Sequence, residues 1–327
     1  MFAAVCTVAV GLAAAALLRG WGDARSESGA TAGEGRDMLD VQQVRTGPHI
    51  VFRSTEPGPN TGRVALVPMD RPTGPRAIAD VSCERVAATR DKGICLSADR
   101  GFTTTYEASI LTGDFTKTHT LPIGGIPSRA RVSPDGALVA MTVFVTGHSY
   151  AQGAFSTATT IHDSATGESF GNLEEFTVIR DGEEYRAMDL NMWGVTFATD
   201  DQFYATVASG GTTWLAEGDL SERTLRTLRD GVECPSLSPD RTRIAYKSKT
   251  GAASWRLHVL DVNSGADVRL AETRSVDDQV AWLDDRTIMY GLPREGSARG
   301  DVWVVPADGS GSPQLLIPDA GSPSAVQ

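Results

Sequence analysis

The pattern Gly-x-Ser-x-Gly at residues 167–171 (GESFG) is the first feature of this sequence that could do chemistry. In hydrolases the pattern holds a nucleophilic serine on a sharp turn between a strand and a helix, with an acid and a histidine later in the chain. Here Ser169 lies beside a polar turn between two expected strands, and His258 is the one histidine that follows. We predict that Ser169 is not a nucleophile.

The tripeptide Lys-Thr-Gly at residues 249–251 matches one element of the serine β-lactamases and penicillin-binding enzymes. Their chemistry also needs Ser-x-x-Lys, which supplies the nucleophile and its lysine. Ser-x-x-Lys occurs nowhere in the 327 residues. We predict that residues 249–251 are a strand end that runs into a turn.

Metal-ligand spacing is absent from the sequence. Paired aspartates, as at 277–278, lack the alternating spacing of a calcium loop, and there is no Gly-rich phosphate loop or dinucleotide fingerprint. We expect no cofactor, and the alternative is a metal site assembled from distant segments. The histidines are dispersed, without metal-ligand partners at the usual spacing. They are His49, His119, His148, His162 and His258.

A recurring pattern indicates the elements that position these residues. It consists of a small apolar strand, a turn with aspartate, and a strand with aliphatic and aromatic residues. Clear copies read ARVSPDGALVAM from Ala130 and PSLSPDRTRIAY from Pro235. Successive turn positions are 44, 44, 65, 40 and 45 residues apart. They are Gly47, Asp91, Asp135, Asp200, Asp240 and Asp285.

A period in the forties, built from strands and turns, is typical of propeller blades. A third strand, a polar turn and a fourth strand follow each hairpin, as in RLHVLDVNSGAD from Arg256. Solenoids of helix pairs have similar periods, but the long 3.6-residue periodicity that they need is absent. We predict an all-β, six-bladed β-propeller of four-stranded blades over residues 41–318, with residues 319–327 as a C-terminal tail.

Two parts of this ring depart from the regular repeat. The interval of 65 residues implies an insertion of about twenty residues in the third blade, which we assign to residues 147–156 and part of 177–189. A propeller must close its ring to bury both faces of every sheet. We expect residues 41–44 to complete the last blade.

The turn Ser-Pro-Asp-Gly has a clear physical basis. Pro134 fixes its own φ, Asp135 accepts hydrogen bonds from nearby backbone, and Gly136 stands where a side chain would clash. In the second copy Arg241 replaces this glycine. This position therefore need not have a positive φ.

Residues just ahead of the inner strands are the candidate binding residues. Propellers commonly bind partners at the end of the channel where these strands begin. Here these positions have mixed charge, and His148 on the insertion is expected to overhang the same face. The alternative is a solvated rim without function. The candidates are Glu84, Arg85, Arg129, Arg131, Asn191, Glu233, Asp277, Asp278, Gln279 and His148.

The Ser-Pro-Asp copies at Ser133 and Ser238, each followed by a strand ending Val-Ala or Ile-Ala, resemble the WD40-like β-propeller repeat of TolB and its relatives. The leader and the sequence from Gly231 (GVECPSLSPDRTRIAYKS) are similar to secreted TolB-like proteins of high-GC Gram-positive bacteria. The resemblance implies a six-bladed fold outside the cytoplasm. The envelope complex of TolB is not carried over, because about forty residues precede the repeats here.

The N-terminal segment differs from the rest of the chain. Residues 2–18 are apolar or small and uncharged, which suits the core of a secretory signal but is short for a membrane span. We assign residues 1–22 to a signal peptide or membrane anchor, with a buried helix as the alternative. Residues 23–40 are polar and rich in small residues, as in a flexible linker.

Two of the four cysteines are spaced for a disulfide. Cys83 and Cys95 flank a turn and would face each other on one hairpin, which suits an oxidising compartment. Two buried thiols are the alternative. Cys234 has no evident partner, and we expect it to be buried as a small apolar residue.

The net charge of −11 and the absence of a basic run argue against a nucleic-acid partner. We expect a monomeric, non-catalytic module that binds a protein, a peptide or a polar ligand at the cell envelope, either secreted or tethered to the membrane through residues 2–18. The alternative is a propeller enzyme, a lyase or glycoside hydrolase, with its site at the channel mouth. Such an enzyme needs two carboxylates at acid/base separation, or a metal.

Overall fold

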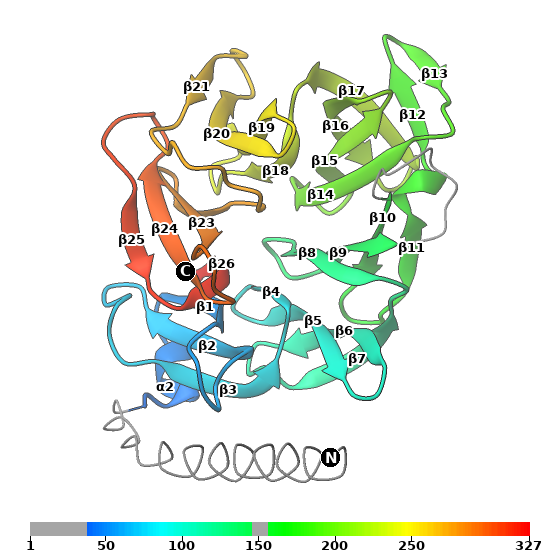
Figure 1. The fold of residues 1–327 in the computed structure, drawn as a ribbon. Coiled ribbons are helices and arrows are strands. Elements are labelled where there is room, and N and C mark those ends of the chain that lie inside the picture. Colours follow the sequence, from blue (N-terminus) through cyan, green and yellow to red (C-terminus); the bar gives the residue numbers. More distant parts are fainter. Residues whose placement is uncertain (1–37, 146–155) are drawn as a thin grey trace, which may run out of the picture. The chain divides into compact units, whose positions relative to one another are not determined.

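The computed structural model describes residues 38–145 and 156–327, and Leu39–Gln327 form one compact unit. The described strands of this unit form six sheets, arranged as blades around a ring (Figure 1). In each blade, apolar residues on both faces are buried against the neighbouring blades. One such layer contains Ile94 and Ile110 of the second blade with Val139 and Met141 of the third. The predicted six-bladed, all-β propeller is confirmed.

Four blades follow the predicted order, from the inner strand outward along the chain. In blade two the strands are β4 (Arg85–Ala88), β5 (Lys92–Arg100), β6 (Thr104–Thr112) and β7 (Lys117–Pro122). In blade three they are β8 (Ile126–Val132), β9 (Leu138–Val145), β10 (Ser156–Asp163) and β11 (Ser169–Asn172). In blade five they are β18 (Glu233–Leu237), β19 (Arg243–Gly251), β20 (Ser254–Asp261) and β21 (Asp267–Arg269). In blade six they are β22 (Ala281–Asp284), β23 (Thr287–Pro293), β24 (Gly300–Pro306) and β25 (Gln314–Ile317).

The Ser-Pro-Asp turns join β8 to β9 and β18 to β19. In the first, the Ser133 hydroxyl donates to Asp135 (2.6 Å) and accepts from the Leu138 amide (2.8 Å). The Ser238 hydroxyl makes the same two bonds, to Asp240 (2.6 Å) and from the Arg243 amide (3.0 Å). The turn sequence therefore satisfies its own polar groups at the end of the inner strand.

The φ angle of Arg241 contradicts one prediction about these turns. Its φ is 61°, against 79° for Gly136 in the matching turn, so the position does need a positive φ. Because the two turns share the same hydrogen bonds, they share the same backbone path. The arginine adopts the left-handed conformation at the energetic cost usual for a residue with a Cβ.

Blade one closes the ring in a way that the sequence did not suggest. Its second to fourth strands are β1 (His49–Ser54), β2 (Arg63–Pro68) and β3 (Ala77–Ser82), and its inner strand is β26 (Ala320–Val326), paired antiparallel with β1. The predicted tail over 319–327 is therefore wrong, because this segment buries Ala320 and Val326 in the ring. Gly47 does not turn an inner hairpin, since the inner strand comes from the other end of the chain.

Residues 41–44 do not form the expected closing strand. They belong to α2 (Val41–Arg45), a short helix whose first turn is capped by Asp40, which accepts from the Gln43 amide (3.0 Å). Val44 is buried against blade one. The helix therefore covers the blade instead of extending it.

Blade four contains β14 (Asn191–Phe197), β15 (Gln202–Ser209), β16 (Thr212–Asp219) and β17 (Thr224–Asp230), and two more strands at its outer edge. The added hairpin is β12 (Thr177–Arg180) and β13 (Glu183–Tyr185), preceded by the 3-10 helix η2 (Leu173–Glu175). It belongs to blade four, not to blade three as predicted, because β12 pairs parallel with β17. The remainder of the predicted insertion, residues 147–155, lies outside the described residues.

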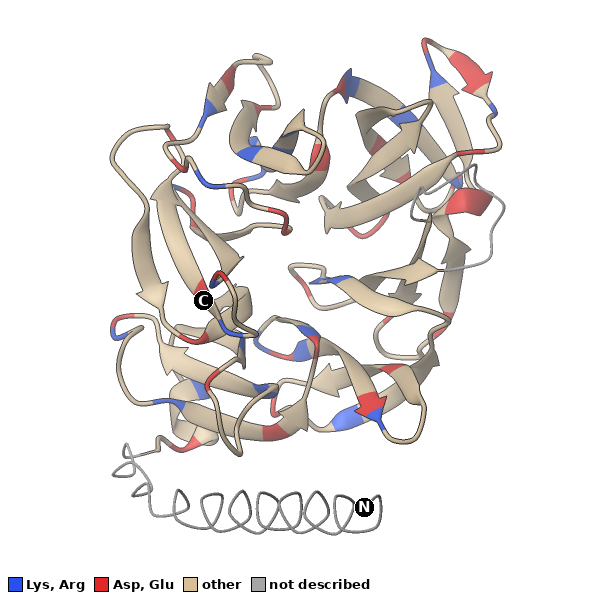
Figure 2. Ribbon diagram, viewed as in Figure 1, with Lys and Arg blue, Asp and Glu red and all other residues tan. Residues whose placement is uncertain are grey.

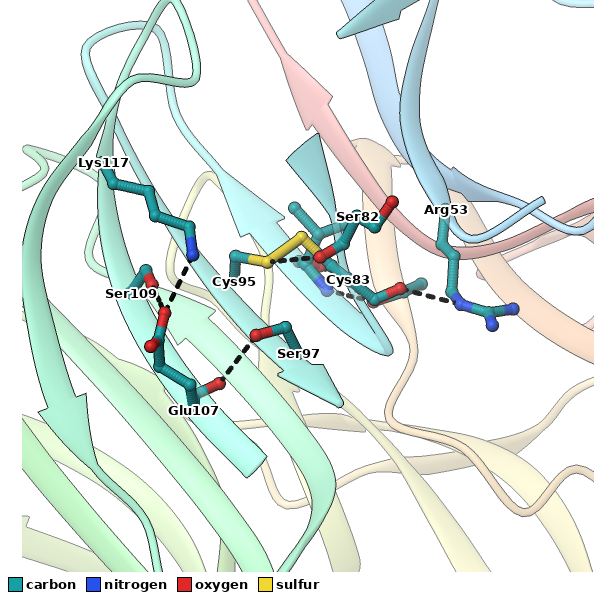
Figure 3. Close-up of a disulfide and its surroundings, with 10 residues drawn as sticks. Arg53, Ser82, Cys83, Cys95, Ser97, Glu107, Ser109 and Lys117 are labelled. Atoms are coloured by element: carbon teal, nitrogen blue, oxygen red, sulfur yellow. Dashed lines mark hydrogen bonds and ion pairs between the residues drawn. A yellow bond between two sulfur atoms is a disulfide. The ribbon is translucent and has the colours of Figure 1, made fainter. Parts of the chain in front are cut away.

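The predicted disulfide is present and joins Cys83 to Cys95 with Cα atoms 5.4 Å apart (Figure 3). Cys95 lies on β5 and Cys83 just before β4, so the bond links the two ends of the inner hairpin of blade two. Arg53 on β1 donates to the Cys83 carbonyl (2.8 Å), which ties this corner to blade one. Cys234 is buried with a free thiol, as expected.

Candidate site at the two ends of the central channel

Two hollows lie at opposite ends of the channel. The start-side cavity, where inner strands begin, has a volume of about 520 Å³ and is lined by 53, 55, 84–85, 127, 275, 277–278, 291–293 and 298–300, with 320–322 of β26. The turn-side cavity, where inner strands run into their turns, has about 400 Å³ and is lined by 87–90, 131–132, 134, 196–197, 236–239, 241, 281–282 and 324–327. Figure 2 shows charges of both signs on the blade ends that face the centre of the ring.

Four of the predicted binding residues line the start-side cavity together: Glu84, Arg85, Asp277 and Asp278. They come from the beginning of blade two and from the loop that leads into blade six. Arg85 donates to both carboxylate oxygens of Asp278, at 3.1 and 3.2 Å. The prediction that residues ahead of inner strands converge at one mouth thus holds for these four.

Asp278 is the centre of a buried ion network. Arg129 lies 3.7 Å from its carboxylate on the side away from the cavity. Burial alone would raise the pKa of Asp278, but Arg85 and Arg129 outweigh it and hold that pKa below its usual value. Asp278 is therefore ionised at neutral pH and cannot act there as a general acid.

Asp277 connects the network to the cavity. Its side chain is 58% exposed and accepts from Lys247, whose own side chain is 4% exposed. Lys247 also lies 3.7 Å from Glu233, and Arg129 lies 3.7 Å from Asp277. A buried charge needs such partners because desolvation is otherwise too costly. The network fixes the carboxylate of Asp277 at the cavity wall.

Three further candidates lie deeper than the rim. Arg129 is only 9% exposed, and Glu233 is buried behind Lys247. Gln279 crosses the channel and donates to the carbonyls of Val195 (3.0 Å) and Pro235 (2.8 Å). These residues support the ring from inside, where side chains from several blades meet.

Arg131 lies in the channel and reaches toward the other mouth. It lines the turn-side cavity and donates to the Val280 carbonyl (3.1 Å) and the Ser236 hydroxyl (3.5 Å). Burial lowers the pKa of Arg131 to about 10, so the guanidinium stays charged at neutral pH. The expected start-side position of Arg131 is not observed, because it follows Arg129 by two residues along β8.

Asn191 and His148 do not contribute to the start-side cavity as predicted. Asn191 accepts from the Thr157 amide (3.0 Å), which joins the inner strand of blade four to blade three, and it does not line the cavity. His148 lies outside the described residues.

Sequence reasoning missed Lys247 and Arg299. Arg299 lines the start-side cavity and donates to Asp319 (2.6 Å). Lys247 lies on the second strand of blade five and points into the channel. A lysine directly after the apolar run Ile-Ala-Tyr was the available signal for it, because a charge there needs a buried partner.

The two catalytic motifs lie at the outer strand of blade three and at the end of the second strand of blade five. Ser169 begins β11, and its hydroxyl accepts from the Gly171 amide (3.0 Å). Thr250 lies near the end of β19 and donates to the Ser254 carbonyl (3.2 Å). Neither motif has the strand–turn–helix or active-site setting of its enzyme class.

Across residues 38–145 and 156–327, no group of three or more histidine, cysteine or carboxylate side chains is arranged to hold a metal ion. Within the same ranges the structure contains no helix that is both long and apolar enough to cross a membrane.

Three known structures are similar to the fold of this chain. TolB from Acinetobacter baumannii is similar over 86% of this chain and 67% of its own, with a TM-score of 0.60 and 17% identity. A TolB protein from Agrobacterium tumefaciens is similar over 84% and 90%, with a TM-score of 0.53 and 12% identity. An oligogalacturonate lyase in complex with manganese reaches a TM-score of 0.48 at 9% identity, over 76% of this chain and 72% of its own, which is too low to bear on activity.

No protein-family model matches the sequence, and no curated protein does. These three structural similarities are below 25% identity and establish the fold alone. The chain has a six-bladed β-propeller fold that is similar to the fold of the two TolB structures.

Proposed function

We propose that this protein is an extracytoplasmic, non-catalytic binding module that holds a protein, a peptide or a polar ligand at its start-side cavity. The observation that supports this most is the exposed carboxylate of Asp277, fixed at the cavity wall by buried Lys247 and Arg129. Preorganised charges bind a complementary partner without losing side-chain freedom in the process. The cavity also presents arginines, so a partner with groups of both signs fits it.

The disulfide between Cys83 and Cys95 supports the extracytoplasmic assignment, because such bonds persist in oxidising compartments. Its support is independent of the apolar segment 2–18, through which we propose export or a membrane tether. The two Ser-Pro-Asp turns support membership of the WD40-like repeat family of secreted TolB-like proteins. We propose that the protein acts as a monomer at the cell envelope.

The charge state of the cavity supports binding over catalysis. A glycoside hydrolase needs one carboxyl group that stays protonated near neutral pH. The pKa of Asp278 is shifted the opposite way, despite the effect of its burial, by Arg85 and Arg129. A charge that is already paired and ionised suits recognition better than proton transfer.

The proposal is tested with the double variant Asp277→Asn/Arg85→Gln. These side chains are partly exposed, so the variant removes charge from the cavity wall and leaves the buried Arg129 and Lys247 in place. Envelope proteins captured by the full chain are quantified by mass spectrometry and the recovered partner is titrated directly. We expect at least about tenfold weaker binding, as for loss of paired charges at an interface.

The matched control is Arg63→Gln/Asp80→Asn, which removes an ion pair of 2.7 Å on the outer part of blade one. It changes the same types of charge away from both cavities. If the control and the cavity variant bind the partner equally well, the proposed function is wrong.

A further inference from the structure

The turn-side cavity is built by all six blades, whereas the start-side cavity is built by blades one, two, three and six. At about 400 Å³ it has the size of a small-molecule site. Its wall is largely apolar, with Val132, Phe197, Leu237 and Trp282 among its residues. An apolar wall of this size suits a ligand with a hydrophobic group.

The charged side chains that line this cavity are all positive. Its lining includes Arg90, Arg131 and Arg241 and no aspartate or glutamate side chain. None of the three arginines forms an ion pair within the described residues, although the protein as a whole has a net charge of −11. Three unpaired cations facing one hollow favour an anion.

Arg131 is the innermost of the three. Its Nε is buried without any hydrogen-bond partner, and its two recorded bonds go to neutral oxygens of Ser236 and Val280. An arginine presents its donors in a planar fork that matches a carboxylate or a phosphate. A buried donor without a partner is costly in an isolated protein, and an anion bound to the partly buried guanidinium of Arg131 would offset that cost.

We propose that the turn-side cavity binds a carboxylate attached to an apolar group, with Arg131 at its base and Arg90 and Arg241 at its rim. The apolar wall favours a singly charged carboxylate over a phosphate, since a phosphate carries more charge and no apolar part. Such a carboxylate comes either from the end of a peptide or from a free organic acid. This site is separate from the start-side cavity, so it does not depend on the binding role proposed above.

The test uses isothermal titration calorimetry on the full chain with four probes: an acetylated tripeptide ending in leucine with a free carboxylate, the same tripeptide amidated, N-acetylleucine and inorganic phosphate. We expect the free-carboxylate tripeptide to bind and its amidated twin not to bind. Equal binding of N-acetylleucine assigns the site to free acids, and tighter binding of the tripeptide assigns it to chain ends. Binding should weaken as salt concentration rises.

Two variants place the site. Arg131→Met should weaken binding by at least about tenfold, as for loss of a hydrogen bond to a charged group. Arg241→Asn should weaken binding by about threefold, because it removes a charge at the rim. Asparagine is chosen there because it also accepts the left-handed conformation. Arg286→Asn is the matched control: Arg286 follows Asp285 in the equivalent turn of blade six and does not line the cavity.

Three results would overturn this assignment. The first is equal binding of the free and amidated tripeptides, or no binding of either carboxylate probe at millimolar concentration. The second is tighter binding of phosphate than of both carboxylates. The third is that the Arg241→Asn and Arg286→Asn variants bind the free-carboxylate tripeptide with the same affinity. This comparison still tests the site if circular dichroism shows that Arg131→Met does not fold.

Discussion

Arg241 occupies a backbone conformation that glycine adopts more easily, as its counterpart Gly136 does. For an L-residue with a Cβ, the left-handed region costs about 1–2 kcal/mol. Such strain persists where the surrounding structure imposes it, and here the Ser238–Asp240 hydrogen bonds set the path of the turn. The strained residue also carries one of the unpaired charges of the turn-side cavity.

We predict that Arg241→Gly raises the free energy of unfolding by about 0.5–1 kcal/mol, because relief of strain exceeds the entropy that glycine adds to the unfolded chain. Urea denaturation followed by circular dichroism measures this change. The same substitution at Arg286, which has no positive φ in the matching turn, should instead lower the free energy of unfolding. A loss of stability at both positions would show that Arg241 is not strained.

At the scale of elements, a disulfide between Cys83 and Cys95 links the inner hairpin of blade two. β4 has four residues, and the disulfide at Cys83 lies just beyond its first residue. The disulfide holds the hairpin closed where Glu84 and Arg85 contribute to the start-side cavity.

We predict that Cys83→Ser/Cys95→Ser lowers the free energy of unfolding by about 2–3 kcal/mol, since the loop that the disulfide closes is short. Thermal unfolding of the oxidised protein, with and without dithiothreitol, measures the effect. The reductant should lower the Tm of the wild type and leave that of the double variant unchanged. A wild-type Tm that is insensitive to full reduction would contradict the prediction.

At the scale of the whole molecule, β26 joins the two ends of the chain. It pairs with β1 and brings Ala320 and Val326 into the cores of blade one and its neighbours. Its residues also contribute to both cavities, since Ser322 lines the start side and Ser324 to Gln327 the turn side. Closure of the ring and construction of the two sites therefore depend on one strand.

We predict that deletion of residues 320–327 abolishes cooperative unfolding or lowers the Tm by more than 15 °C, roughly the effect of several kcal/mol, because β1 becomes an exposed edge. Differential scanning calorimetry with size-exclusion chromatography measures both stability and aggregation. Deletion of Gln327 alone removes one exposed hydrogen bond to the Leu283 carbonyl and should change stability by less than about 0.5 kcal/mol. A cooperative, monomeric protein after the larger deletion would refute this role of β26.

Local chemistry in the sequence was enough to predict the blades. The serine and aspartate of each Ser-Pro-Asp turn bond to backbone within five residues, so the turn follows from neighbouring residues alone. The recurrence of the turn pattern along the chain then predicted the six blades. The pairing of Cys83 with Cys95 is also local, because both lie on one hairpin. Glu84 and Arg85 lie together where the inner strand of blade two begins, so their place at the start-side cavity could also be predicted from the sequence.

Only the tertiary structure decided the contacts between distant segments. The closing strand is β26 and not residues 41–44, and β12 joins blade four, because these pairings depend on which exposed edge a segment meets. The sequence also could not predict which charged side chains form ion pairs with one another. Arg129 and Arg131 are two residues apart, yet Arg129 lies beside the carboxylates of Asp277 and Asp278, while Arg131 lines the turn-side cavity and forms no ion pair with the described residues. Charge pairing across a ring is set by distances between blades, and no spacing along the chain encodes those distances.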